Sequence, residues 1–193
     1  MLRVSREGKP LLVWVEMNAI PDISEIHKVS DPQAICAVIN AAAQIYRGVI
    51  PEDCWHEPYM SVAALDQEIN DGVVFWGVSQ RAELLAVMGF QPRGAVDLIR
   101  HAYVCPGRQR NGLGRALLEK IHDQSLCPIL VGTWASAHWA IRFYERNGYQ
   151  RLNPQHTARL LDTFWRIPKR QADASVVLAR GNAYERLQLA GEV

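Results

Sequence analysis

The chain has 193 residues, of which 49% are hydrophobic and 21% charged, and its formal net charge at pH 7 is +1. This length suits one domain with a sizeable hydrophobic core. The near-neutral balance argues against a dedicated nucleic-acid binder, because affinity for a phosphate backbone rests on clustered excess lysine and arginine. Small molecules are therefore the expected partners, with no nucleic acid and no membrane.

The four cysteines are widely scattered and form no pattern typical of zinc ligands, so we expect no metal. Reduced thiols suit a cytoplasmic protein, and this is the expected localisation. The apolar run at residues 11–15 is short and lacks a cleavage site of small residues, so no signal peptide is expected. No segment approaches the roughly 20 apolar residues that cross a bilayer.

The N-terminal part predicts a strand followed by a one-sided helix. Residues 1–22 are interpreted as an N-terminal extension, and residues 23–28 as the first strand. Asp31 then supplies a helix cap and Pro32 the first helical residue. Apolar residues at helical spacing extend this helix to Tyr46.

A loop rich in aromatic and acidic residues comes next. Residues 46–59 include Trp55, His56 and Glu57, and they form either part of a binding site or a packed connection over the core. Ser61 predicts the cap of a short helix that ends near residue 71.

Three apolar runs predict a meander of antiparallel strands. They cover residues 73–78, 84–90 and 96–104, with turns expected at residues 79–83 and 91–95. After a helix that begins at residue 113, residues 129–134 predict another buried strand. Because a strand, a helix and a strand of this length make a right-handed crossover, strands 96–104 and 129–134 should be parallel and adjacent.

The turn between the first of these strands and its helix is typical of an anion site. It reads Val104-Cys-Pro-Gly-Arg-Gln-Arg-Asn-Gly-Leu-Gly-Arg115. The first backbone N–H groups of a helix have no partner within it, and the helix dipole adds positive charge there. Gly112 and Gly114 let a ligand approach the main chain closely. The sequence therefore predicts a phosphate-bearing ligand at this turn.

Two motifs together resemble the signatures of the GNAT superfamily of N-acetyltransferases. The first is Gln109-x-x-Gly112-x-Gly114, which is similar to the acetyl-CoA signature. The second is Ala140-x-x-Phe143-Tyr144-Glu145-Arg146-x-Gly148-Tyr149, in a helix that Ser136 is predicted to cap and Gly148 to end. Their order and separation also match the family. From about residue 23 the order of elements follows it as well.

The resemblance implies an α/β (α+β) GNAT fold: a central, mixed, twisted sheet of six to seven strands, flanked by about four or five helices. The parallel pair ending at Val104 and Trp134 should splay to make the cofactor slot. We expect the GNAT domain at residues 23–180 and a C-terminal tail at 181–193. A helix near residues 157–166 is an insertion, and it either covers the acceptor pocket, extends the core or makes a dimer contact. A last strand is expected at residues 174–179.

The resemblance also implies acetyl-CoA as cosubstrate and direct attack by an amine on its thioester. The residues expected to bind it are Tyr103, Val104, Gln109, Arg110, Asn111, Gly112, Leu113, Gly114 and Arg115. Tyr144 matches the family position of the general acid, and a tyrosine with a pKa near 10 is protonated at neutral pH. The backbone N–H near Val104 should bind the carbonyl oxygen.

The general base does not follow from the motif, because Leu98 stands where many family members have glutamate or histidine. His101 is the preferred candidate if a bulge turns it inward. Asp97, Glu57, His56 or a water relay remain alternatives.

We expect a small-molecule N-acetyltransferase, with a protein or peptide N-terminus as the alternative acceptor. A non-catalytic acyl-CoA-binding module is the alternative from another class, and a homodimer is possible. The aromatic residues that could line the acceptor pocket are Trp55, Tyr59, Trp76, Trp134 and Trp139.

Overall fold

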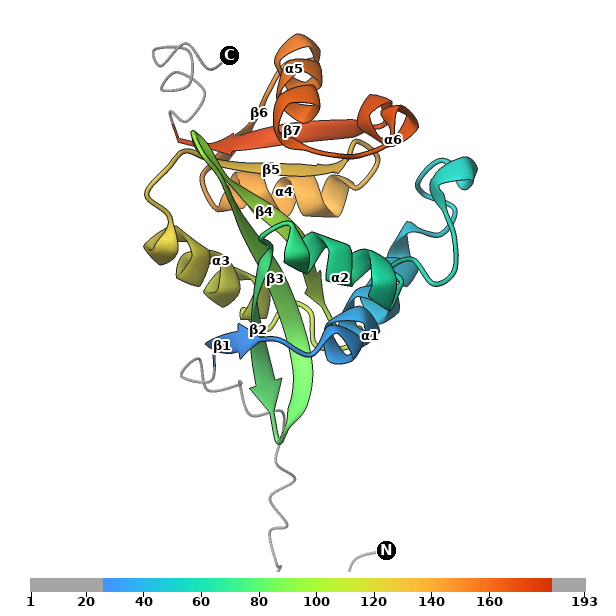
Figure 1. The fold of residues 1–193 in the computed structure, drawn as a ribbon, viewed down its shortest axis with the longest axis vertical. Coiled ribbons are helices and arrows are strands. Elements are labelled where there is room, and N and C mark those ends of the chain that lie inside the picture. Colours follow the sequence, from blue (N-terminus) through green and yellow to red (C-terminus); the bar gives the residue numbers. More distant parts are fainter. Residues whose placement is uncertain (1–25, 182–193) are drawn as a thin grey trace, which may run out of the picture.

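A seven-stranded mixed sheet lies at the centre of the computed structural model, which describes residues 26–181 (Figure 1). The spatial order is β1-β2-β3-β4-β5-β7-β6, and β4 and β5 form the parallel pair. The strands are β1 (Ile26–Val29), β2 (Val74–Gln80), β3 (Glu83–Arg93), β4 (Val96–Val104), β5 (Ile129–Trp134), β6 (Tyr149–Arg151) and β7 (Ser175–Arg180). The predicted sheet is confirmed. The extension at 1–22 and almost all of the tail at 181–193 lie outside the described residues.

Helices cover both faces of this sheet (Figure 1). They are α1 (Pro32–Ala43), α2 (Val62–Asn70), α3 (Leu113–Gln124), α4 (His138–Arg146), α5 (Pro154–Phe164) and α6 (Lys169–Asp173). Successive strand residues point to opposite faces. Met88 and Ile99 therefore pack under α3 and α4, whereas Val87 packs under α1 and α2 and Leu98 under α5.

Local sequence signals explain most helix ends. The Asp31 carboxylate accepts the Gln33 N–H at 2.9 Å, and the Ser61 hydroxyl accepts the Ala64 N–H at 3.2 Å. Gly148 has a φ of 85°, which is the left-handed conformation expected after α4. The predicted cap at Ser136 is wrong, because α4 begins one residue later, after Ala137, and without a side-chain cap.

The two meander turns are tighter than predicted. β2 ends at residue 80 and β3 begins at residue 83. The turn between them is therefore Arg81-Ala82, with both residues at positive φ. β3 also includes residues 91–93, which pair with residues 96–98 of β4. Only two residues remain for the second turn, and Gly94 supplies its φ of 71°.

The inserted segment is longer than predicted. α5 begins at Pro154, because the Asn153 side chain caps it by accepting the His156 N–H at 2.9 Å. A second helix, α6, follows α5 before β7 and was not predicted. Leu160, Leu161 and Phe164 of α5 pack with strand residues from β4, β5 and β7, so the insertion does extend the core.

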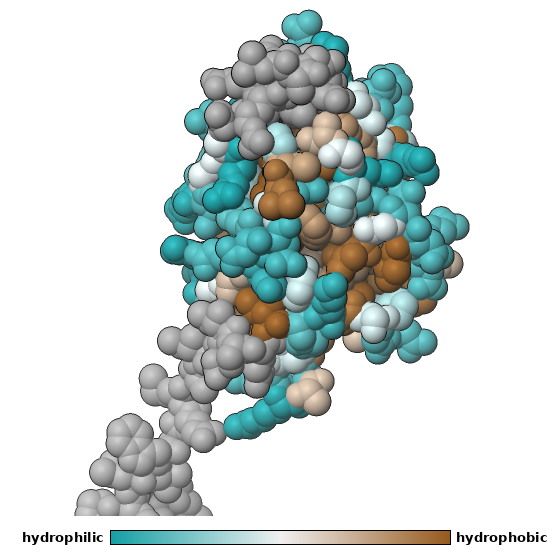
Figure 2. Space-filling model, turned by 60° about the vertical axis from the view of Figure 1, so that its left-hand side comes forward, coloured by the Kyte–Doolittle hydropathy of each residue, from teal (hydrophilic) through white to brown (hydrophobic). Residues whose placement is uncertain are grey.

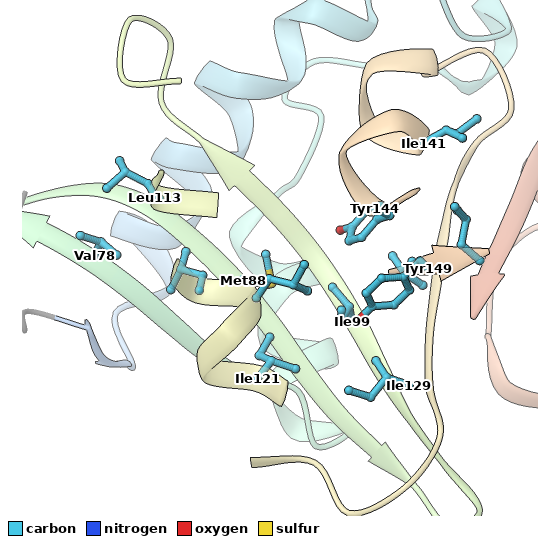
Figure 3. Packing of buried hydrophobic residues seen from close by; sticks show 14 of the residues in the cluster. Val78, Met88, Ile99, Leu113, Ile121, Ile129, Ile141, Tyr144 and Tyr149 are labelled. Carbon is cyan, nitrogen blue, oxygen red and sulfur yellow. The ribbon is translucent and has the colours of Figure 1, made fainter. Parts of the chain in front are cut away.

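The largest core cluster lies between the sheet and helices α3 and α4 (Figure 3). It contains Met88 and Ile99 from the strands, Ile121 from α3 and Tyr144 from α4. The surface seen in Figure 2 is mostly hydrophilic and carries separate hydrophobic patches. Among residues 26–181, no helix has the length and apolar character of a membrane span.

Candidate active site

The parallel strands β4 and β5 pair over only three residues each and then separate. Residues 97–99 of β4 pair with 129–131 of β5. Beyond this point β5 stays with β7, where Gly132 pairs with Val177, while β4 stays with β3, where Tyr103 pairs with Val87. The predicted splay is therefore present, and it leaves a gap at the carboxyl ends of the two strands.

One cavity of about 690 Å³ opens on the α3 side of this gap, and we call it the α3-side cavity. Among the described residues, no acidic side chain lines it. Five of its lining residues are arginines: Arg108, Arg110, Arg115, Arg142 and Arg146. This lining complements a ligand that carries several negative charges. Arg142 and Arg146 lie one turn apart on α4, a spacing that could have indicated them from the sequence.

The glycine-bearing turn forms the floor of the α3-side cavity. Arg110 and Gly112 adopt left-handed conformations with φ of 64° and 82°, and Gly112 caps α3 without a side-chain bond. The first hydrogen bond of the helix runs from the Ala116 N–H to the Gly112 carbonyl at 2.9 Å. The N–H groups of the three preceding residues thus remain outside the helical ladder. An anion can be bound by them.

All but one of the nine predicted cofactor-binding residues line the α3-side cavity. The exception is Asn111, which does not contribute to its wall. Gly114 lies against α4, where a Cβ at this position would meet the Phe143 ring at 3.5 Å. An alanine methyl fits at that distance, but a larger side chain must enter the cavity.

A second cavity of about 580 Å³ lies on the opposite side of the gap, beside α2 and α5, and we call it the α5-side cavity. It is lined by charged residues of both signs, including Glu57, Glu68, Arg100 and Arg166. Trp165, which follows α5, forms part of its wall and packs over Gly132 of β5, where an added Cβ would meet the Trp165 ring at 3.4 Å. The insertion therefore also covers this cavity.

Aromatic residues surround the end of the α5-side cavity nearest the gap. The Trp134 indole N–H donates to the Tyr59 hydroxyl at 3.0 Å, and both residues line the cavity. Of the other predicted pocket aromatics, Trp139 lines the α3-side cavity instead, and Trp55 packs on Tyr59. Trp76 lies under Lys120 of α3 and borders neither cavity.

The two cavities share part of their walls. Tyr46, Ala102, Tyr103 and Tyr144 line both of them, so they are adjacent at the gap between β4 and β5.

Tyr144 is buried in this shared wall and is only 4% exposed. It comes from α4, and its ring projects toward β4 (Figure 3). Burial raises its pKa, and the neighbouring Tyr149 and Tyr46 raise it further. The hydroxyl therefore stays protonated over the physiological pH range and can donate a hydrogen bond into the gap.

A bulge in β4 places His101 in the α5-side cavity. Arg100 pairs with Gly89 and Tyr103 with Val87, so two residues of β4 face the single residue Met88 of β3. His101 has a φ of 46°, and its ring lines the cavity. The condition on which His101 was a candidate, a bulge that turns it inward, is therefore met.

The other candidate bases are placed differently. His56 and Glu57 line the α5-side cavity. Asp97 borders neither cavity, and its carboxylate is buried and accepts the Ser125 hydroxyl at 2.6 Å. Leu98 is fully buried beneath α5. The position where many family members have a base is thus part of the core in this chain.

The family model for the acetyltransferase (GNAT) domain matches residues 70–151, which include both motifs and the splayed strands. This segment of the chain is therefore similar to a GNAT acetyltransferase domain. No curated protein matches the chain in sequence at a significant level.

Solved GNAT structures share the fold at low sequence identity. An acetyltransferase from Staphylococcus aureus has a TM-score of 0.60 at 17% identity, covering 80% of this chain and 96% of its own. The PaiA N-acetyltransferase of Thermoplasma acidophilum, solved in complex with coenzyme A, has a TM-score of 0.61 at 16% identity, with coverage of 81% and 97%. The ribosomal-protein-S18-alanine N-acetyltransferase of Escherichia coli has a TM-score of 0.55 at 17% identity, with coverage of 80% and 91%.

Proposed function

We propose that this protein transfers the acetyl group of acetyl-CoA to a primary amine of a small molecule. The observation that supports this most is the pair of cavities that meet at the β4–β5 gap and share Tyr103 and Tyr144 in their walls. One cavity suits a polyanionic donor, and the other suits a compact acceptor.

The α3-side cavity is the proposed acetyl-CoA site. Backbone N–H groups of Leu113, Gly114 and Arg115 bind the pyrophosphate, and the surrounding arginines neutralise its charge. Tyr103 and Val104 offer main-chain groups to the pantetheine arm along the free edge of β4. Acetyl-CoA supplies the activated thioester when it is bound.

Two side chains are proposed to move or hold protons. His101, on the α5 side, accepts a proton from the ammonium form of the acceptor, which leaves the neutral amine that can attack. Tyr144 donates a hydrogen bond to the leaving sulfur. Because burial raises the pKa of Tyr144, its contribution is stabilisation of the thiolate by that hydrogen bond more than complete proton transfer.

The size of the α5-side cavity favours a small acceptor. The loop around Tyr59 and the segment after α5 both contribute to its wall. The exposed ion pair between Asp53 and Arg170, at 2.7 Å, joins these two segments. A protein N-terminus is the second candidate, since ribosomal-protein-alanine N-acetyltransferases from two organisms share the fold.

The test is a thiol-release assay with acetyl-CoA and a panel that contains small amines and N-terminal peptides of matched charge. Turnover with small amines at a higher kcat/KM than with any peptide supports the proposal. Faster turnover with peptides assigns the protein acceptor instead. If calorimetry shows tight acetyl-CoA binding but no amine releases thiol, the protein is a non-catalytic acyl-CoA-binding module.

A further inference from the structure

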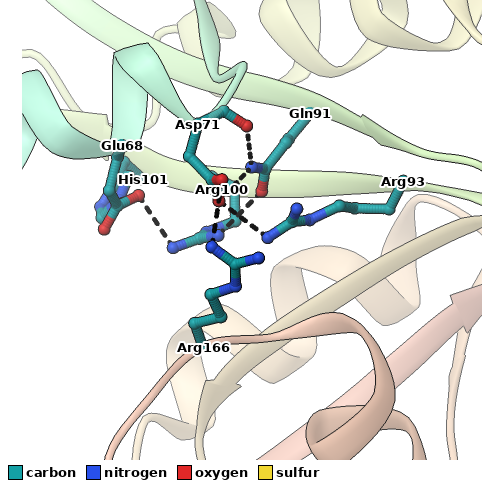
Figure 4. A network of polar contacts seen from close by, with 7 residues as sticks. All are labelled: Glu68, Asp71, Gln91, Arg93, Arg100, His101 and Arg166. Atoms are coloured by element: carbon teal, nitrogen blue, oxygen red, sulfur yellow. Dashed lines mark hydrogen bonds and ion pairs between the residues drawn. The ribbon is translucent and has the colours of Figure 1, made fainter.

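Glu68 of α2 occupies a position that the sequence motifs do not indicate. Its Oε2 atom lies 2.6 Å from the His101 Nε2 atom, and the Arg100 Nη2 atom donates to the same oxygen at 2.8 Å (Figure 4). Glu68 follows Leu65 by three residues and shares its inward face of α2. The side chain of Glu68 is 25% exposed and that of His101 is 14% exposed, so the contact is largely shielded from solvent.

The surroundings keep Glu68 ionised. Burial by itself raises the pKa of this carboxyl, but the hydrogen bond from His101 and the charges of His101 and Arg100 outweigh burial and lower the pKa. Arg100 is held in turn, because its Nη1 atom donates to the Gln91 side-chain oxygen at 2.9 Å. Gln91 is fully buried and donates to the Asp71 carbonyl at 2.9 Å. The carboxylate is therefore fixed by a chain of bonds that crosses β3 and β4.

An ionised carboxylate only accepts hydrogen bonds, so the Nε2 atom of His101 carries a proton. In the neutral imidazole the Nδ1 atom is then the acceptor. The ring is also packed against Phe75, with centroids 6.0 Å apart. Orientation and tautomer of the imidazole are thus both set by groups outside β4.

We propose that Glu68 is the positioning residue for His101, holding the tautomer whose Nδ1 atom accepts the proton of the acceptor ammonium. The step breaks the N–H bond of the ammonium and forms an N–H bond at Nδ1. The resulting imidazolium is stabilised by the adjacent carboxylate of Glu68. This inference rests on the proposed function, in which His101 is the base.

Several charged groups face His101 from neighbouring elements. Glu68 comes from α2, and Arg100 precedes His101 on β4, whereas β2 contributes only the uncharged ring of Phe75. The other charged or titratable residues that line the same cavity are Tyr46, Cys54, His56, Glu57, Tyr59, Tyr103, Tyr144 and Arg166. Of all these groups, Glu68 makes the direct bond to the imidazole.

The experiment compares wild type, Glu68→Gln and Asp71→Asn, each first checked for its thermal unfolding transition. Asp71→Asn removes one negative charge from the same network, where Asp71 pairs with Arg93 at 2.8 Å, but it leaves the bond to His101 intact. For each protein, kcat/KM for the best amine is measured against pH, and the His101 ring is titrated by NMR without acetyl-CoA.

Glu68→Gln should lower kcat/KM about 10- to 100-fold. It should also move the acid limb of the profile and the NMR titration curve to lower pH, because the imidazolium loses its counter-charge. Asp71→Asn should leave both curves in place, while the KM for acetyl-CoA stays constant in both variants.

Two results distinguish failure of this inference from failure of the proposed function. If wild type acetylates an amine but Glu68→Gln keeps the wild-type pH profile, Glu68 does not position the base and the inference is overturned. If no amine is acetylated, the proposed function fails, and the NMR titration alone decides whether Glu68 controls His101. An unchanged curve in Glu68→Gln then overturns the coupling too.

Discussion

The α3-side and α5-side cavities meet at the same pair of strands, yet their linings come from different sources. The α3-side cavity takes its floor from one continuous turn, residues 104–115, and uses backbone N–H groups and arginines. The α5-side cavity takes its lining from several separate stretches between residues 46 and 175, and its charges have both signs. Backbone geometry encoded by a contiguous motif is readable from sequence, whereas side chains that converge from distant segments are not.

The largest effect that this comparison predicts is on the backbone-built cavity. Gly114→Val should lower acetyl-CoA affinity at least about 100-fold, because the γ-methyl groups meet the Phe143 ring or fill the slot. Gly114→Ala is the matched control. Its Cβ would lie 3.5 Å from Phe143, an ordinary contact, so binding should be close to wild type. Isothermal titration calorimetry with acetyl-CoA measures both, and wild-type affinity in Gly114→Val would contradict the assignment of the site.

The second prediction concerns the wall that the two cavities share. Tyr144→Phe should reduce kcat about 10- to 100-fold and leave the KM for acetyl-CoA nearly unchanged, because the hydroxyl acts on the leaving sulfur. The buried ring keeps its packing against Tyr149, so the fold should be retained. Steady-state kinetics with a fixed amine give both constants. A rise in KM at constant kcat would instead make Tyr144 a binding residue.

The same contrast explains which parts of the molecule could be predicted. The glycine turn and the parallel pairing of β4 with β5 follow from contiguous patterns, whereas the splay of these strands follows from the family resemblance; the structure has all three features. The bulge at His101 had no signal of its own in the sequence. Turn lengths were less accessible, because the non-glycine residues Arg81 and Ala82 form a tight turn at positive φ without a glycine signal.

The acceptor side was the least predictable. Glu68 reaches His101 across 33 positions of sequence, and Trp165 reaches Gly132 in the same way. Only packing brings these pairs together. The departure of Leu98 from the family pattern is visible in the sequence, but its reason is visible only in the structure, where the inserted helix α5 packs over it.

The third prediction sharpens the electrostatic side of the comparison. The folded-state pKa of Glu68 lies below its ordinary value of 4.5. A depressed pKa stabilises the fold above the unfolded-state value, and this stabilisation is lost as pH falls through the folded-state value. The free energy of unfolding of wild type should therefore decrease below about pH 4.5 more steeply than that of Glu68→Gln. Urea denaturation between pH 3 and 7 measures the difference, and parallel curves would contradict it.

The smallest expected effect lies at the rim of the α5-side cavity. Asp53 and Arg170 are both more than half exposed, so water and salt screen their ion pair. Arg170→Gln should leave the thermal unfolding midpoint unchanged, because an exposed pair of this kind contributes little to stability. Its effect should appear instead in the KM of the acceptor, since the pair joins the loop near Tyr59 to α6 at the cavity wall. Arg170→Gln should raise this KM about two- to fivefold, and high salt should raise the KM of wild type but not that of the variant, if the pair holds the rim closed. An unchanged KM at every salt concentration would mean that packing of Trp165 and Tyr59, and no charge, shapes the acceptor side.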